Sequence, residues 1–239
     1  VGEKVYKLHI EALLSICVLP WMSLIRPNPQ LSSHVLNLIK MFSFSVRTKI
    51  YKHATSSFTQ TRYLGTLADR ATRATQRILR RLSKENSKHL GRKLGKLMNR
   101  YPCTVVRVVL EQVQSYPNMI QVVVESLKYS STLSLDVLVN SLIVCMSSSK
   151  SKIKSDGQHV ELWFSSLCSF AGALFKRFKL IDLSATLQYV LNTVKDGQIL
   201  DLLILKELIT QMTGIEVLRD ISETQRLLLS AGSHLQMHH

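Results

Sequence analysis

The sequence predicts an all-α protein built as a solenoid of stacked helix pairs. Hydrophobic residues make up 46% of its 239 residues, and there are only nine glycines and five prolines. This composition is typical of compact helical proteins and argues against disorder. Apolar residues recur at helical spacing, and short polar or proline-containing breaks separate the helical stretches.

The first helices are expected to end at clear breaks. Arg26-Pro27-Asn28-Pro29 is a hard break, because proline lacks an N–H and disfavours helix in the residue before it. The serine- and threonine-rich stretch 55–61 is expected to be a loop. We therefore expect helices over residues 3–19 and 33–53, the second with an apolar stripe formed by Val35, Leu38, Phe42, Val46 and Ile50.

Residues 12–25 could be mistaken for a membrane span. The stretch is only 14 residues long, whereas about 18 apolar residues are needed to cross a bilayer, and Pro20 interrupts it. A signal peptide is also conceivable, but no small-residue cleavage site follows. We interpret the stretch as a buried helix broken at Pro20, and no membrane partner is expected.

The remaining helices follow one another closely. Pro102 and Pro117 fit the first turns of two helices. The valine-rich segment after Pro102 could also be read as a strand, but its length and its neighbours favour helix. The loop MSSSKSKIKSDGQ, from Met146, is the clearest surface loop. The other expected helices cover residues 67–84, 87–99, 133–146, 159–179, 182–195 and 200–213.

Two of these helices have recognisable ends. Asp182 can cap the helix over 182–195, and Gly197 can end it in a left-handed turn. In the helix over 200–213, Leu202, Leu205, Ile209 and Met212 recur at helical spacing, and Gly214 supplies a stop. Paired helices with short loops indicate an α-solenoid of the HEAT or MIF4G kind, although no fixed repeat period is visible.

Positive charge is concentrated in one quarter of the chain. Residues 40–100 hold 16 Lys and Arg against two acids, and so carry +14 of the net +15. Such a field attracts phosphates or an acidic partner surface, or is a helix face neutralised by another subunit. The expected apolar stripe of the basic helix is Ala71, Ala74, Ile78 and Leu82. The candidate contacts for RNA or an acidic partner are Arg70, Arg73, Arg77, Arg80, Arg81, Lys84, Arg92, Lys93 and Lys96.

No catalytic or metal-binding pattern is present. Gly91, Gly95 and Lys96 imitate a phosphate loop, but the spacing is one residue short and Leu97 replaces the required Ser or Thr. Asp136 and Glu161 are interpreted as solvated helix residues. The four cysteines are interpreted as small buried thiols rather than disulfides, and a plain tail is preferred over a metal site for His234, His238 and His239. We expect no enzyme activity and no cofactor.

Several strings resemble the large helical subunit of the THO complex. These are DLLILKELITQMTGIE from Asp201, SLKYSSTLSLDVL from Ser126, WFSSLCSFAGALFKRF from Trp163, and RILRRLSKEN from Arg77 followed by GRKLGKL. Asp136-Val137-Leu138 stands where the family has YDVLAY, although the flanking residues differ. The resemblance runs from about residue 74 to about residue 216. It predicts a region 61–216 of this family, a helical N-terminal extension 1–60 and a poorly assigned tail 217–239.

The resemblance implies a nuclear scaffold for messenger-RNA packaging and export. Proteins of this family hold the other THO subunits together, and their MIF4G-like portion docks a DEAD-box RNA helicase, which supplies the ATP hydrolysis. The expected partners are therefore other THO subunits and this helicase, with RNA as a further partner. The alternative hypothesis is a nucleic-acid-binding helical module that acts through the basic segment 62–100.

Overall fold

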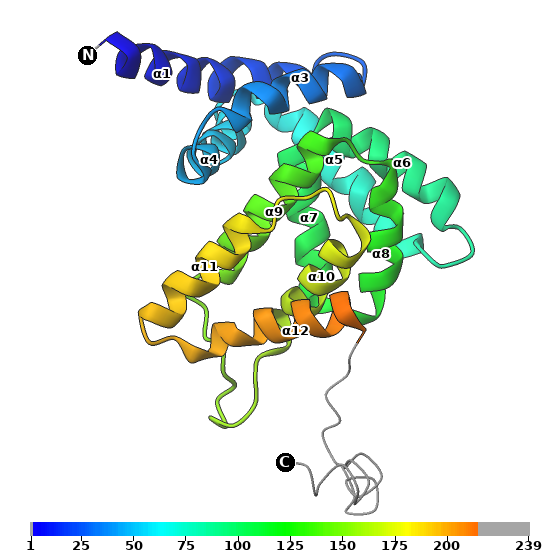
Figure 1. Ribbon diagram of the computed structural model, residues 1–239. Coiled ribbons are helices and arrows are strands. Elements are labelled where there is room, and N and C mark those ends of the chain that lie inside the picture. The colour runs from blue at the N-terminus through cyan, green and yellow to red at the C-terminus, as the bar shows by residue number, and fades with distance from the viewer. Residues whose placement is uncertain (1, 215–239) are drawn as a thin grey trace, which may run out of the picture.

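The computed structural model describes residues 2–214, which form an all-α stack of paired helices (Figure 1). The predicted fold class is confirmed, and within this range the only β pairing is an isolated bridge between Ile153 and Val160. The predicted tail 217–239, with its three histidines, lies outside the described residues. In chain order the helical elements are α1 (Gly2–Ala12), η1 (Leu13–Val18), α2 (Leu19–Met22), α3 (Pro29–Lys40), α4 (Phe44–Gln60), α5 (Arg62–Arg81), α6 (Ser87–Arg100), α7 (Pro102–Ser115), η2 (Pro117–Met119), α8 (Ile120–Ser126), η3 (Leu127–Tyr129), α9 (Thr132–Met146), α10 (Leu162–Arg177), α11 (Ser184–Lys195), η4 (Ile199–Asp201) and α12 (Leu202–Thr213).

The first helix continues through Pro20, so the predicted break there is wrong. The π turn η1 lies just before the proline, which has no N–H to donate and whose ring would clash with the carbonyl four residues earlier in a regular helix. The predicted burial of residues 12–25 is correct for one face of the helix only, since Leu13, Ile16 and Trp21 are each more than half exposed. None of the helices in residues 2–214 combines the length and hydrophobicity that a bilayer-crossing segment needs.

The second predicted helix is in fact two helices. Asn28 caps α3 by accepting from the backbone N–H of Gln30, at 3.0 Å, which confirms the break around Pro29. The chain then leaves the helix at 41–43, and α4 runs on to Gln60 through the stretch predicted as a loop. The hydroxyls there stay within the helix, since Thr55 Oγ1 donates to the carbonyl of Tyr51 at 2.9 Å. Burial of Ala54 and Phe58 holds this extra length in place.

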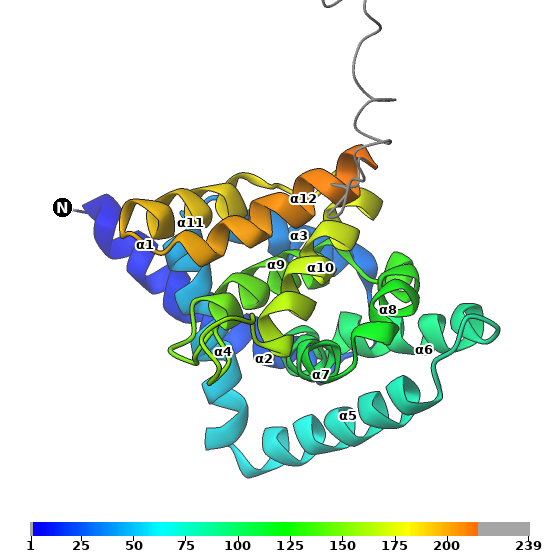
Figure 2. The same cartoon turned by 90° about the horizontal axis from the view of Figure 1, so that it is seen from below.

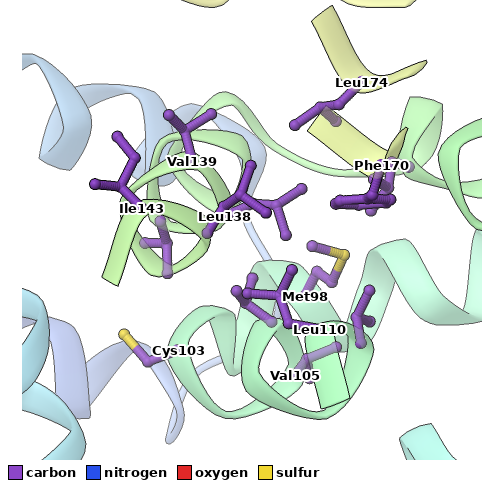
Figure 3. Packing of buried hydrophobic residues seen from close by; sticks show 14 of the residues in the cluster. Met98, Cys103, Val105, Leu110, Leu138, Val139, Ile143, Phe170 and Leu174 are labelled. Carbon is purple, nitrogen blue, oxygen red and sulfur yellow. The ribbon is translucent and has the colours of Figure 1, made fainter. Parts of the chain in front are cut away.

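Helix α7 forms the centre of the molecule, and it contacts α4, α5, α6, α9 and α10. Val105, Val106, Val109 and Val113 are fully buried, so the valine-rich segment is helical as predicted because packing overrides the strand preference of valine. Figure 3 shows Leu110 of α7 close to Met98 of α6, with Leu138 of α9 and Phe170 of α10 bordering the same core.

Helix α6 approaches η3 closely through two glycines. A Cβ atom on Gly95 would lie only 2.4 Å from the backbone oxygen of Tyr129, and one on Gly91 would lie 3.0 Å from the Tyr129 ring. Glycine is therefore required where the two backbones meet. Gly172 has the same role between α10 and α12, since its Cβ would lie 2.8 Å from the backbone oxygen of Glu207.

Helix α12 packs with a different face from the one predicted. Ile204 and Leu208 are buried, whereas Leu202, Ile209 and Met212 of the predicted stripe are exposed. Because apolar residues surround most of this helix, spacing alone does not select the inner face. Its end is as predicted, with Gly214 in the left-handed region at φ 75°, and Gly197 ends α11 in the same way at φ 80°.

Asp136 is a structural residue, so its interpretation as a solvated acid is wrong. Its carboxylate accepts from Arg47 Nη1 at 2.9 Å and from the Tyr51 hydroxyl at 2.5 Å, which joins α9 to α4. Asn140, one turn further along α9, donates to Thr48 Oγ1 at 2.9 Å. Burial and the neighbouring carboxylate raise the pKa of Tyr51 well above its usual range, so this hydroxyl remains a donor at neutral pH.

The serine-rich loop lies at the surface as predicted, but one of its lysines is anchored. Lys152 Nζ donates to both carboxylate oxygens of Asp201, at 2.8 and 2.9 Å, and Asp201 is fully buried. The same ammonium lies 5.1 Å from the centroid of the Phe164 ring. The pair ties the loop to η4, at the start of the last helix.

The close approach at Gly95 predicts a marked effect of adding one methyl group. Gly95→Ala would normally favour a helix by about 1 kcal/mol. Here the overlap with the backbone of Tyr129 should instead lower the free energy of unfolding by roughly 2 kcal/mol, measured by urea denaturation. Lys88→Ala, on the exposed side of α6, is the control and should change it by less than about 0.5 kcal/mol. An unchanged or stabilised Gly95→Ala protein would contradict the observed packing.

The link between α4 and α9 predicts a second loss of stability. Asp136→Ala removes the acceptor of both Arg47 and Tyr51, leaving a largely buried guanidinium unpaired. The free energy of unfolding should fall by roughly 2–3 kcal/mol. Glu125→Ala, an exposed acid on α8, is the matched control and should be nearly neutral. Equal effects of the two substitutions would show that the Asp136 contacts contribute nothing.

Candidate nucleic-acid or acidic-partner surface

The predicted basic residues gather on the outer face of α5 and α6. The inner face of α5 buries Ala71, Thr75 and Leu79, which recur every four residues. The predicted apolar stripe is therefore only partly correct: Ala71 is buried, whereas Ala74, Ile78 and Leu82 are half-buried. Figure 2 shows α5 running along one edge of the molecule, with α6 beside it.

All nine predicted contact residues are exposed. Arg73, Arg77 and Arg80 follow one another at steps of four and three, so they lie along one side of α5. A helix of 20 residues is about 30 Å long. These side chains therefore form an elongated positive surface, which we call the α5–α6 basic face. It consists of Arg70, Arg73, Arg77, Arg80, Arg81, Lys84, Arg92, Lys93 and Lys96.

The turn between the two helices is held by one side chain. Asn86 Nδ2 donates to the carbonyl of Arg81 at 2.6 Å, and its Oδ1 accepts from the N–H of Ser83 at 2.8 Å. Ser87 Oγ donates to the carbonyl of Lys84 at 3.0 Å. These hydrogen bonds fix α5 relative to α6, and so fix the spacing between the cations on the two helices.

Within residues 2–214, no member of the basic face forms an ion pair. The ion pairs Arg47–Asp136, Arg107–Glu111, Lys152–Asp201 and His159–Asp156 lie elsewhere. Arg92 lies over the Tyr129 ring at 5.8 Å from its centroid, which orients the side chain without neutralising its charge. Arg100, by contrast, is half-buried and donates from Nε to the carbonyl of Ser23 at 2.7 Å, which makes it a structural residue. Uncompensated guanidinium groups repel one another, and an anionic partner removes this repulsion.

The apparent phosphate loop has a packing role. Gly91 and Gly95 lie inside α6 rather than in a loop, and both pack against Tyr129. Lys96 points away from this contact into solvent, as part of the basic face. The backbone N–H groups that would hold a phosphate are used by the helix.

The buried thiols lie in environments unsuited to nucleophilic chemistry. Burial raises the pKa of Cys103 to about 11 and that of Cys168 still further, so both remain protonated at neutral pH. Cys17 is exposed and Cys145 half-buried, so the predicted burial holds fully for only two of the four. Among the described residues no three His, Cys, Asp or Glu side chains are grouped as a metal site would require.

The structure also brings together cations that sequence spacing does not connect. Lys40 at the end of α3 lies near Arg177 and Lys179 at the end of α10, around one hollow. These residues are separated by more than half of the chain, so no local signal in the sequence could have found the cluster.

Comparison with known proteins places most of the chain in one family. The family model described as "THO complex subunit 2 N-terminus" matches residues 7–92, and the one described as "Transcription- and export-related complex subunit" matches residues 94–168. The similarity thus reaches the N-terminal helices, which carried no recognisable motif. The Arabidopsis thaliana, Homo sapiens and Saccharomyces cerevisiae relatives are each named as a subunit of a complex and not as an enzyme.

Relatives from plants, animals and fungi match nearly the whole chain. The THO complex subunit 2 of Arabidopsis thaliana is 33% identical over 236 residues, which are 98% of this chain and 13% of that protein. The Homo sapiens subunit is 34% identical over 95% of the chain, and that of Saccharomyces cerevisiae 29% identical over 92%. The chain spans only 13–14% of the length of these three relatives.

Proposed function

Because the chain belongs to the THO complex subunit 2 family, we propose that it is a scaffold segment of the nuclear THO complex. In this proposal the segment supports co-transcriptional packaging and export of messenger RNA. It does so by binding other THO subunits and by docking a DEAD-box RNA helicase, which supplies the ATP hydrolysis. The segment itself carries no catalysis and needs no cofactor.

The observation that supports a scaffold role best is the apolar surface at both ends of the helix stack. The first helix exposes Leu13, Ile16 and Trp21, and the last two helices expose Leu191, Ile209 and Met212. Terminal repeats of an isolated solenoid need a polar outer face. Apolar outer faces are instead expected where further helices or partner subunits cover them.

The division of labour within the chain is part of the proposal. Residues 61–216 are the MIF4G-like region that would dock the helicase, and residues 1–60 extend the same solenoid. The packing of α3 and α4 on α9, which gives residues 1–60 a shared core with the rest, supports the proposal that they extend one solenoid. Stacked helix pairs of this kind offer broad surfaces to protein partners.

Affinity capture tests the scaffold role. The 239-residue chain, immobilised and incubated with nuclease-treated nuclear extract, should retain THO subunits and a DEAD-box helicase, identified by mass spectrometry. Ile16→Ser with Trp21→Ser, which alters only exposed apolar residues, should reduce capture while leaving the helical circular dichroism unchanged. Lys154→Glu with Lys195→Glu, at two exposed residues, serves as the control and should not reduce capture. Recovery of neither THO subunits nor helicase by a folded chain would contradict the proposal.

A second candidate function is RNA binding by the α5–α6 basic face. The observation that favours it is the set of nine exposed cations without an ion-pair partner in residues 2–214. Arginine offers a planar pair of N–H donors that suits phosphate oxygens. Because the nine are Lys and Arg side chains, the contacts would be mainly to the phosphate backbone, and Tyr63, exposed on the same helix, is available to stack on a base.

The salt dependence of binding tests this second function. Affinity for a single-stranded oligouridine should fall steeply with salt, since each neutralised phosphate releases counterions. Arg73→Glu with Arg77→Glu and Arg80→Glu should reduce the slope of log K against log salt by about 2. Lys154→Glu with Lys195→Glu and Lys206→Glu changes the net charge equally at exposed residues outside α5 and α6 and should have a much smaller effect. Weak or salt-independent binding would exclude the function, and loss of protein capture in the arginine variant would make this face a protein interface.

A further inference from the structure

A hollow of about 660 Å³ lies between the end of α3, the start of α9 and the connection from α10 to α11. In Figure 1 this connection follows the yellow end of α10 and leads into α11. No residue of α5 or α6 lines the hollow, so it is separate from the basic face. Its lining residues are Leu36, Lys40, Arg47, Thr132, Leu135, Asp136, Arg177, Phe178, Lys179, Leu180, Ile181 and Asp182.

The charge around the hollow is unbalanced. Asp136 is paired with Arg47 at 2.9 Å and also accepts from Tyr51. The carboxylate of Asp182, just before α11, accepts from the backbone N–H of Ser184 at 2.9 Å and from its hydroxyl at 2.6 Å.

Both acids are thus already used by the fold. The hydrogen bonds from Ser184, and to a smaller extent the positive charges of Arg47 and Lys40, lower the pKa of Asp182 below its usual range, so its carboxylate stays ionised at neutral pH. Lys40, Arg177 and Lys179 remain, exposed and without an ion-pair partner in the described part of the chain.

The floor of the hollow is apolar. Leu36 is buried beneath it, and Leu135, Phe178 and Ile181 are half-buried along its sides. Leu180 is fully exposed at its rim, at the turn of the connection. Exposure of a whole leucine side chain at the edge of an apolar hollow costs free energy that a bound apolar group would recover.

We propose that this hollow binds a short acidic, amphipathic peptide segment of a partner protein. An apolar side chain of the peptide enters between Leu135 and Phe178 and is covered by Leu180. Neighbouring Asp or Glu side chains of the peptide meet Lys40, Arg177 and Lys179. The apolar floor fixes the peptide, and the three cations select for acidic sequences.

The same features disfavour RNA as the occupant. Phosphate groups gain nothing from a floor of Leu and Ile, and Phe178 is the only aromatic residue in the lining. The cations surround one hollow instead of following a track along which a polyanion could lie. The hollow is a different surface from the α5–α6 basic face, so peptide binding in the hollow does not depend on RNA binding at that face.

A library of short random peptides displayed on phage tests the proposal. Selection on the folded chain should enrich sequences that combine Asp or Glu with Leu, Ile or Phe. A labelled peptide from that pool should bind, by fluorescence anisotropy, roughly tenfold more weakly to the variant Lys40→Glu with Arg177→Glu and Lys179→Glu. Leu180→Ser should also weaken binding and leave the unfolding midpoint unchanged, since the side chain makes no buried contact.

The matched control reverses three arginines on the basic face. Arg73→Glu with Arg77→Glu and Arg80→Glu changes the net charge by the same amount and should leave peptide binding nearly unchanged. Enriched peptides without acidic residues, or equal loss in the two triple variants, would overturn the proposal. Loss of oligouridine binding in the hollow variant alone would overturn it in favour of a nucleic-acid site.

Discussion

The burial of most of α7 is the constraint on which the rest of the structure depends. Apart from an exposed strip with Arg107 and Glu111, α7 is apolar, and such a helix is stable in water only when neighbouring helices cover its apolar faces. Helices α4, α5, α6, α9 and α10 do so. Each enclosing helix therefore has one face committed to α7 or to the core around it. For α5 this leaves Ala71, Thr75 and Leu79 inside, and all of its arginines must lie outside. The positive surface is thus a consequence of what α5 has to cover.

Close packing around this centre depends on small residues and on a few polar links. Gly95 and Gly172 let α6 and α12 approach their neighbours to distances that a side chain would prevent. The Arg47–Asp136–Tyr51 contacts join helices that are more than 80 residues apart in the chain, and Lys152–Asp201 joins the long loop to the last helix. Buried polar links of this kind fix which helices are paired, whereas apolar contacts alone tolerate sliding.

The sequence predicted what depends on local chemistry. The helix ends at Gly197 and Gly214 were predicted correctly, because a left-handed turn is decided by a few adjacent residues. The break before Pro29 was also predicted, although α3 begins at Pro29 and not at residue 33 as expected. The errors arose where distant packing decides. The stretch 55–60 is helical because Ala54 and Phe58 are buried, and α12 buries Ile204 and Leu208 because it packs along α10. The basic face was predictable since its residues share one segment, whereas the cluster of Lys40, Arg177 and Lys179 exists only in the fold.

These two positive surfaces show that net charge does not define a partner, since the shape beneath the charge matters as much. The α5–α6 basic face is a long, exposed series of arginines and lysines without an apolar floor, so its attraction is electrostatic and falls as salt rises. The hollow near α9 places fewer cations around buried leucine and phenylalanine, so apolar contact adds a salt-resistant contribution there. A chain with net charge +15 can therefore carry two contacts that respond differently to ionic strength. For a scaffold, that difference would allow an RNA and a protein partner to be held at the same time without competing for the same cations.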